Sequence, residues 1–324
     1  MMDGNSLFND VQRIPEIAAD VFQQALRSSF LAGRSGARSV VIAGVGQAAL
    51  AADLFAAAAG ASLAVPVLVC SEPILPAYVN HDTLVIVMSA GGDADEPVHA
   101  LSDGVSRGAA IVVIAGGGRL MEMADAQDFP KILLPEASLV SSIELSALFF
   151  ALWGAFSSAS TPSDLRLADG EAEAKQTLGL LRRQLRAFAP EQPADSNPAR
   201  QLSAALEDTT PVIFGQGAIA SAAARAWRSR FRIVAERFAL YDDLPSPLGY
   251  LNAGPAAHIA GGADFTGIVL HEGAETPTLS RQSEVAAREM SGPCHQISLD
   301  GDTPLERLWG AVYLADWAAF YSAR

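Results

Sequence analysis

The sequence has little cysteine, little lysine and no long uninterrupted apolar segment. Its two cysteines, Cys70 and Cys294, lie far apart and outside any C-x-x-C spacing, which argues against a disulfide scaffold and a cysteine zinc cluster. We expect both to be buried, inert thiols in a reducing cytoplasm. Lys131 and Lys175 are the only lysines, so amine chemistry has two candidates.

Targeting and membrane signals are also missing. The N-terminus, MMDGNSLFND, lacks a cationic segment followed by an apolar one, which argues against secretion. The most apolar stretch, residues 40–60, is interrupted by Gln47 and Asp53 and has two glycines near its start. It therefore predicts a buried strand, a turn and a buried helix rather than a membrane span. We expect a cytoplasmic protein without a membrane partner.

The charge balance is acidic, with 22 basic and 36 acidic residues and a formal net charge of -14. Nucleic acid needs a cationic footprint, so a nucleic-acid partner is not expected. Half of the residues are hydrophobic and 18% are charged, which favours a large buried core. A chain of 324 residues allows two domains of ordinary size.

Short apolar runs alternate with helical patterns along the chain. Runs of Val, Ile and Leu predict buried strands at 39–46, 65–70, 83–90, 109–116, 129–136, 210–217, 265–273 and 293–301. Helices are predicted at 6–31, 139–156, 165–189 and 304–324. Two polar stretches, 157–164 and 190–198, read as a linker and a break.

A weak internal repeat supports two similar domains. Gly44-Val-Gly46 and Gly215-Gln-Gly217 each follow an apolar run and precede an alanine-rich helix. We therefore predict an α/β protein with two tandem doubly wound parallel-sheet domains, each an αβα sandwich, at residues 1–160 and 161–324.

Cofactor and metal motifs do not fit this chain. Gly44-Val-Gly46 has Ala49 at the third glycine position of a dinucleotide fingerprint, and Glu72 lies too far on to bind ribose. G-x-x-x-x-G-K-[ST] and G-x-S-x-G motifs are missing, and the five histidines show no H-E-x-x-H or H-x-H pairing. No cofactor and no metal are expected.

The order of these motifs resembles the sugar isomerase (SIS) fold, and within it the bifunctional phosphoglucose/phosphomannose isomerase family. The family's first loop is similar to GVGQAALAAD (44–53), and its phosphate loop is similar to MSAGGDADE (88–96). RAWRSRFRIVAERF (225–238), Leu244-Pro245 and Asp316-Trp317 also match the family's pattern. The resemblance covers nearly the whole chain and implies two SIS domains and a homodimer.

Isomerisation of a sugar phosphate needs hydroxyls and N–H groups for the phosphate, a base that moves a proton between carbons, and a group that opens the ring. The hydroxyl residues that the resemblance implies are replaced by Ala48, Met88, Ala90 and Asp93. Asp93 introduces a carboxylate where a dianion would bind, which opposes phosphosugar binding. We expect Asp93, Asp95 and Glu96 to satisfy the N-terminus of the helix that follows the loop.

The catalytic groups that the resemblance implies are replaced as well. Ile233 stands at the base position, Gly249 at the ring-opening histidine and Ser141 near the arginine, and the tail lysine has no counterpart. Glu236, His258 and Asp242-Asp243 are candidate substitutes, although surface or capping roles are favoured for the carboxylates and a loop role for His258. The cleft is predicted to contain Gly44, Gly46, Ala48, Ser89, Ala90, Gly91, Gly92, Asp93, Ser141 and Ile233.

Three interpretations of function follow. The first is a protein that has lost standard isomerase chemistry and binds a carbohydrate derivative or regulates sugar metabolism. The second is an active aldose-ketose isomerase of glucose or mannose 6-phosphate with Glu236 and His258 as relocated catalytic groups. The third is a binder of a neutral or cationic ligand. Arg225, Arg228, Arg230 and Arg232 predict a cationic helix face, exposed to solvent or part of a subunit interface.

Overall fold

The computed structural model describes residues 4–136, 142–244, 265–273, 284 and 293–323. Contacts divide the chain into an N-terminal unit, Arg13–Leu178, and a C-terminal unit, Gly179–Arg324 together with Met1–Gln12. The division falls inside two helices, α1 (Gly4–Leu26) and α6 (Gly170–Phe188). The domain boundary at residues 160 and 161 stays a prediction.

The N-terminal unit contains a five-stranded parallel sheet in the order β2-β1-β3-β4-β5. The strands are β1 (Ser39–Ala43), β2 (Val67–Cys70), β3 (Thr83–Ser89), β4 (Ala110–Ala115) and β5 (Lys131–Leu133). All seven residues of β3 are buried, as the continuous apolar run predicts for a central strand covered on both faces. The chain order reverses between β1 and β3, where the carboxyl ends of the strands form the usual ligand crevice of such sheets.

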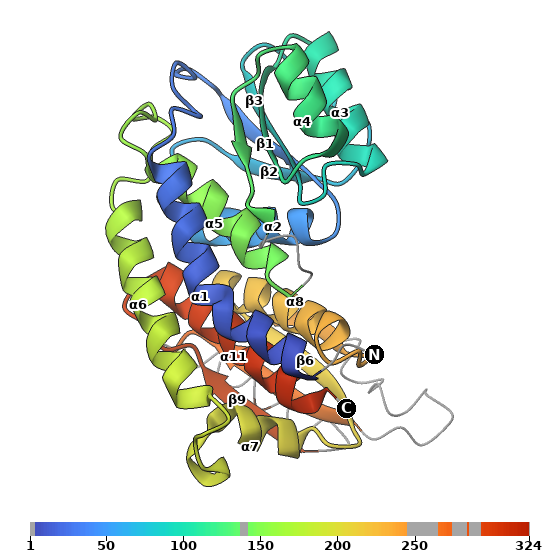
Figure 1. The fold of residues 1–324 in the computed structure, drawn as a ribbon, viewed down its shortest axis with the longest axis vertical. Coiled ribbons are helices and arrows are strands. Elements are labelled where there is room, and N and C mark those ends of the chain that lie inside the picture. The colour runs from blue at the N-terminus through green and yellow to red at the C-terminus, as the bar shows by residue number, and fades with distance from the viewer. Residues whose placement is uncertain (1–3, 137–141, 245–264, 274–283, 285–292, 324) are drawn as a thin grey trace. The chain divides into compact units, whose positions relative to one another are not determined.

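Helices cover the two faces of this sheet (Figure 1). They are α2 (Gln47–Ala59), α3 (Asp95–Ser106), α4 (Gly118–Ala126) and α5 (Glu144–Ser157). One core cluster joins Val85 and Val113 of the sheet to Leu101 of α3 and Leu120 of α4. On α2, Phe55 meets the aromatic side chains of α5, which is buried over almost its whole length.

Residues 157–164 do not form the predicted linker. Ser158 and Thr161 are 3% and 2% exposed. The Ser158 hydroxyl donates to the carbonyl oxygen of Ser28, and the Thr161 hydroxyl donates to that of Ala155. The segment is part of the N-terminal unit, because its small hydroxyl side chains satisfy buried backbone carbonyls rather than water.

The C-terminal unit contains a four-stranded parallel sheet in the order β7-β6-β8-β9. The strands are β6 (Thr210–Gln216), β7 (Leu240–Leu244), β8 (Phe265–His271) and β9 (Cys294–Ser298). The helices are α7 (Pro198–Ala205), α8 (Ala218–Ile233) and α11 (Pro304–Ser322), with a 3-10 turn, η2, at Ala194–Ser196. This order repeats the first four positions of the other sheet, which confirms the predicted pair of parallel-sheet α/β units.

Helix α7 and strand β7 are among the elements that the sequence prediction missed. Helix α7 begins directly after Asn197, whose side-chain oxygen accepts the N–H groups of Ala199 and Arg200, with Pro198 at the first helical position. The sequence prediction instead places Asn197 and Pro198 in the polar break at residues 190–198. Strand β7 has the sequence LYDDL, and its residues before Leu244 are half-buried or exposed, so it lacks an apolar run.

A buried ion pair joins α8 to α11. The guanidinium of Arg230 lies 3.6 Å from the carboxylate of Asp316, with 1% and 3% of the side chains exposed. Arg230 therefore lies in the core, and its predicted place on a solvated or subunit-interface helix face is wrong. Burial raises the pKa of Asp316 to about 7, although the charge and hydrogen bond of Arg230 oppose that rise.

This pair predicts a pH dependence of stability. The raised pKa lets the folded state hold the Asp316 proton between about pH 4 and 7, where the unfolded chain releases it. The contribution to the free energy of unfolding therefore falls as pH rises, by at most about 1.4 kcal/mol per pH unit. Urea unfolding measures the free energy of unfolding of wild type and of Asp316→Asn. The wild-type value minus the variant value should decline from about pH 5 to about pH 7. If the free energies of unfolding of the two proteins changed with pH in parallel, the prediction would be contradicted.

Candidate active site

The glycine loop that follows β3 is joined to the loop that follows β4. The Gly116 N–H donates to the carbonyl oxygen of Ala90 over 2.7 Å, and the Leu120 N–H donates to that of Gly92 over 3.0 Å. Gly92 adopts φ +82°, and a Cβ atom there would lie 1.8 Å from the carbonyl oxygen of Gly117. The two loops approach so closely that only glycine fits at this position.

Ser89 and Gly91 complete the first of these loops. The Ser89 hydroxyl oxygen accepts the N–H of Gly92 over 3.1 Å, and the side chain is 9% exposed. Around Gly91, a Cβ atom would meet nothing within 4 Å. The predicted residues Ser89 to Asp93 thus form one compact turn at the carboxyl end of β3.

Asp93 caps a helix, although not the helix that was predicted. Its Oδ1 accepts the backbone N–H of Arg119, over 3.0 Å, in the first turn of α4. The Arg119 Nη2 donates over 2.6 Å to the Asp93 carbonyl oxygen and over 2.6 Å to Asp95 Oδ1. The helix that follows the loop, α3, has Ala94 as its N-cap and no side-chain cap bond. The joined loops turn Asp93 toward the neighbouring helix instead.

We call Asp93, Arg119 and Asp95 the acidic clasp. The hydrogen bond and charge of Arg119 lower the pKa of Asp95 below its ordinary value. Asp95 and Glu96 also lie in the first turn of α3, where negative charge suits the helix dipole. The clasp therefore favours the ionised form of Asp95 beside the loop that the family resemblance assigns to phosphate.

The other predicted loop of this unit lies between β1 and α2. A Cβ atom on Gly44 would lie 2.9 Å from both the Ala48 Cβ and the Met88 carbonyl oxygen, so this loop contacts the end of β3. Gly46, at φ +59°, is the N-cap of α2 and makes no side-chain cap bond. Ala48 is 2% exposed and presents a methyl group. The structure brings the first loop and the β3 loop together.

A carboxylate also meets a helix N-terminus in the C-terminal unit. Glu272 directly follows β8, and its Oε1 accepts the Ile219 N–H of α8 over 3.1 Å. Gly217, at φ +90°, leaves room for this carboxylate, because a Cβ atom there would lie 2.7 Å from Oε1. β6 and β8 are neighbours at the strand-order reversal of this sheet, so Glu272 occupies its crevice.

Ile233 and Glu236 lie at the opposite edge of the C-terminal sheet. α8 leaves the carboxyl end of β6 and must return to the amino edge, because β7 starts at Leu240 and runs parallel to β6. Arg237 donates to the carbonyl oxygens of Leu206 and Thr209, just before β6. Within this unit, Glu236 is separated from the strand ends where ligands of parallel sheets usually bind.

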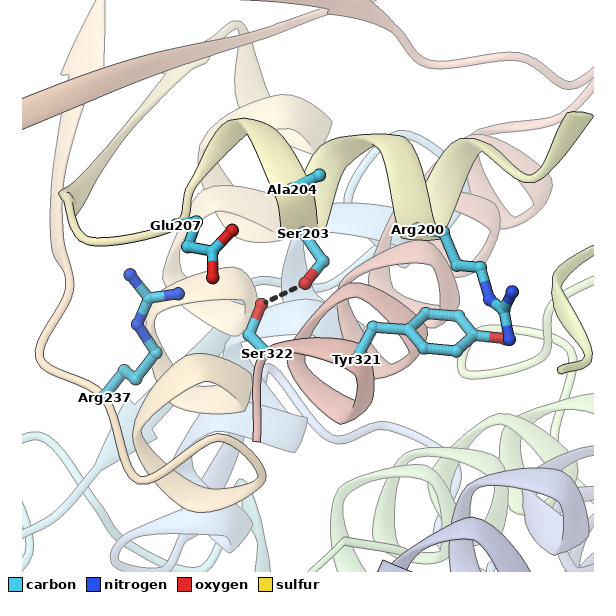
Figure 2. A pocket seen from close by; sticks show the side chains of 7 residues that line it. All are labelled: Arg200, Ser203, Ala204, Glu207, Arg237, Tyr321 and Ser322. Carbon is cyan, nitrogen blue, oxygen red and sulfur yellow. Dashed lines mark hydrogen bonds between the residues drawn. The ribbon is translucent and has the colours of Figure 1, made fainter. Parts of the chain in front are cut away.

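Glu236 lines a cavity of about 340 Å³ with Asp208, Ala235, Arg237 and Ser322. A second cavity of about 400 Å³, drawn in Figure 2, shares Arg237 and Ser322 with it. Its other lining residues are Arg200, Ser203, Ala204, Glu207 and Tyr321. Because the two cavities share these lining residues, we refer to them together as the α7 groove.

The remaining candidates fall into two groups. Ser141 and His258 lie outside the described residues. Asp242 and Asp243 lie on β7, where the Asp243 N–H donates to Asp242 Oδ1 over 2.8 Å. Asp243 is exposed at the edge of the sheet, in agreement with the surface role that was weighed for it.

Sequence reasoning missed Arg119 and Glu272. Arg119 follows Gly116-Gly117-Gly118 after an apolar run, and Glu272 follows the run that ends at His271. Charged residues directly after predicted strands were the available signal, because carboxyl ends of parallel strands share one edge. Which helix each side chain reaches depends on strand order, and the sequence does not display that order.

Metal ligands and membrane spans were sought over the part of the chain that the structure describes. No group of three or more His, Cys, Asp or Glu side chains there could hold a metal ion. Nor does any described helix have the length and apolar character needed to cross a bilayer.

Comparison with known proteins agrees with this architecture. Residues 195–324 match the model of the bacterial phospho-glucose isomerase C-terminal SIS domain. Tagatose-6-phosphate ketose/aldose isomerase from Escherichia coli superposes with a TM-score of 0.67 at 14% identity, over 97% of this chain and 91% of that one. The C-terminal domain of glucosamine-fructose-6-phosphate aminotransferase from Francisella tularensis gives 0.64 at 13% identity, over 98% and 96%. The chain has the SIS fold of phosphosugar isomerases.

Sequence similarity narrows this class. The chain is 26% identical to the bifunctional phosphoglucose/phosphomannose isomerase of Caldicellulosiruptor bescii, over 98% of this chain and 93% of that protein. The Thermoplasma acidophilum enzyme of the same name is 32% identical over 31% of the chain. The chain is a SIS-fold protein that resembles the bifunctional phosphoglucose/phosphomannose isomerase family, as its motifs indicate.

The joined loops predict different tolerances at two adjacent glycines. Gly92→Ala places a methyl group against the Gly117 carbonyl and forces an L-residue to a positive φ, so the free energy of unfolding should fall by about 2 to 3 kcal/mol. Gly91→Ala is the control, because a Cβ atom there meets open space. Chemical denaturation of both variants measures the difference. Equal stabilities would contradict the close approach of the loops.

Proposed function

We propose that this chain has lost the standard isomerase chemistry of its relatives and binds a carbohydrate derivative or acts as a regulatory protein. The observation that supports the proposal is the acidic clasp. Asp93 is held in the loop that the resemblance assigns to phosphate, with its carboxylate on the N-terminus of α4. A phosphate dianion in that loop would meet fixed negative charge from Asp93 and Asp95, which Arg119 offsets only in part.

The absence of hydroxyl donors at the aligned positions supports the same proposal. Met88 and Ala48 are buried and carry no polar group, and Ala90 offers a methyl group at 6% exposure. Ser89 already uses its hydroxyl oxygen to accept the Gly92 N–H. Phosphate recognition in such loops depends on several neutral donors acting together, so this loop offers a poor site for a dianion.

The catalytic positions give a parallel argument. Ile233 cannot move a proton between carbons, and Glu236 lies at the amino edge of its sheet beside Arg237. A general base must lie within hydrogen-bond reach of the proton that it abstracts. Within the C-terminal unit, the cavity that Glu236 lines is part of the α7 groove, so a substrate bound there is the form of the active-isomerase alternative that this unit supports. A cytoplasmic location, expected from the cysteine content and the N-terminal sequence, and a homodimer, expected from the resemblance, remain part of the proposal.

Enzyme assays test the loss of isomerase chemistry. Glucose 6-phosphate, fructose 6-phosphate and mannose 6-phosphate should not interconvert beyond the rate without protein, and none should raise the thermal midpoint. The Caldicellulosiruptor bescii relative is a suitable positive control for the assay. Turnover that disappears in Glu236→Gln would instead establish an isomerase with a relocated base.

Replacing Asp93 tests whether its negative charge opposes phosphate binding in the β3 loop. Asp93→Ser keeps an oxygen that can cap α4 and removes the charge, so stability should change by less than about 1 kcal/mol. The Ser variant should gain a thermal shift with glucose 6-phosphate or inorganic phosphate that the wild type lacks. Asp125→Ser is the control, because Asp125 is an exposed carboxylate on α4 that pairs with Lys131. An equal shift in both variants would show that the Asp93 charge does not exclude phosphate.

A further inference from the structure

The α7 groove is a second polar depression, separate from the strand-end crevice of the C-terminal unit. Its two cavities, about 400 Å³ and about 340 Å³, fall in the size range of small-molecule sites. Its walls come from α7, the end of α11 and the segment after α8 (Figure 2). All of these elements belong to the C-terminal unit, and the groove lies at the amino edge of the sheet.

The side chains of the groove are held in place before any ligand binds. The Arg237 Nη2 donates to two backbone carbonyls over 2.6 Å each. Arg200 donates to the Pro190 carbonyl oxygen over 3.0 Å and lies 5.0 Å from the centre of the Tyr321 ring. The Ser203 and Ser322 hydroxyls lie 3.0 Å apart in the middle of the groove. Such fixed side chains lose little rotamer freedom on binding.

Backbone strain is concentrated at the same place. Among the described non-glycine residues, positive φ occurs at Asp128, Asp208 and Glu236. Asp208 (φ +58°) and Glu236 (φ +52°) both line the smaller cavity of the groove. Strained backbone of this kind gathers at ligand sites more often than elsewhere, so its presence at two lining residues favours a binding role.

The mixed charge of the groove selects a class of ligand. Figure 2 shows Glu207 beside Arg237 at one end, the two serine hydroxyls in the middle and Arg200 over Tyr321 at the other end. A phosphorylated ligand would face the carboxylates of Glu207, Asp208 and Glu236, and a cationic ligand would face two arginines. A neutral hydroxyl group both donates and accepts, so it can bond to carboxylate, guanidinium and serine side chains alike.

We propose that the α7 groove binds a neutral polyhydroxylated molecule, a monosaccharide or polyol without phosphate. This inference rests on the proposed carbohydrate-binding function and gives it a place and a ligand class. It also places ligand recognition in the C-terminal unit, instead of in the β3 loop of the N-terminal unit, where Asp93 opposes phosphate.

Titration of the full chain with glucose, and separately with mannose, tests the inference by the chemical shifts of backbone amides. A ligand with about twelve non-hydrogen atoms in an open groove should bind with a dissociation constant of roughly 1 to 10 mM. The shifts should cluster on α7 and the end of α11. Glucose 6-phosphate should bind at least about threefold more weakly than glucose, because of the groove carboxylates.

Variants distinguish sugar binding in the α7 groove from nonspecific binding of sugar elsewhere on the protein. Glu207→Gln should weaken glucose binding about tenfold and reduce the discrimination against glucose 6-phosphate. Ser203→Ala should weaken glucose binding about threefold. Glu171→Gln on α6 is the control, because Glu171 is an exposed carboxylate that pairs with Lys175 outside the groove. Thermal midpoints of all variants confirm that each is folded.

Three results would overturn the inference. The first is no binding of either sugar up to about 50 mM, which is weaker than its size should allow. The second is equal affinities in all variants, and the third is tighter binding of glucose 6-phosphate than of glucose. Any of these leaves the isomerase assay unaffected. Conversely, turnover of a phosphosugar contradicts the loss of isomerase chemistry, whereas the groove titration still decides whether a neutral sugar binds.

Discussion

Every helix begins with N–H groups that have no partner within the helix, and in this protein carboxylates from neighbouring loops bond to them beside the strand-end crevices. Asp93 accepts the Arg119 N–H of α4, and Glu272 accepts the Ile219 N–H of α8. Helix N-termini at such positions bind phosphate in many α/β proteins. Here the protein's own carboxylates bond to these N–H groups.

Two glycines leave the space that the close approach of these loops and carboxylates needs. Gly92 can approach the Gly117 carbonyl only without a side chain, and Gly217 leaves the room that the Glu272 carboxylate fills. The loops thus keep the backbone form of the SIS fold, with carboxylates bonded to the helix N-termini. A polar groove elsewhere in the C-terminal unit, with fixed arginines and paired hydroxyls, offers a second surface on which carbohydrate recognition could rest.

Much of the fold could be predicted because buried parallel strands have a plain sequence signal. β3 is buried at every residue, and its run of Val, Ile and Met predicts a buried strand. β7 has no such signal, because its acidic, partly exposed sequence is held by pairing with β6. Helix α7 was missed because Asn197-Pro198 fits both a loop and a helix start, and only the bonds from Asn197 to Ala199 and Arg200 decide between them.

The sequence by itself determined the class of the protein: two parallel-sheet units with a glycine loop after the first strand of each. The motif resemblance also places Ala48, Asp93 and Ile233 where the family has polar groups. Only the tertiary structure decided what the charged residues do. Arg230 is buried against Asp316, Asp93 reaches α4 instead of α3, and Glu236 lies at the far edge of its sheet from the strand ends. Periodicity reports which residues are buried, whereas the partner of a charge depends on strand order and loop closure, which bring together residues distant in the chain.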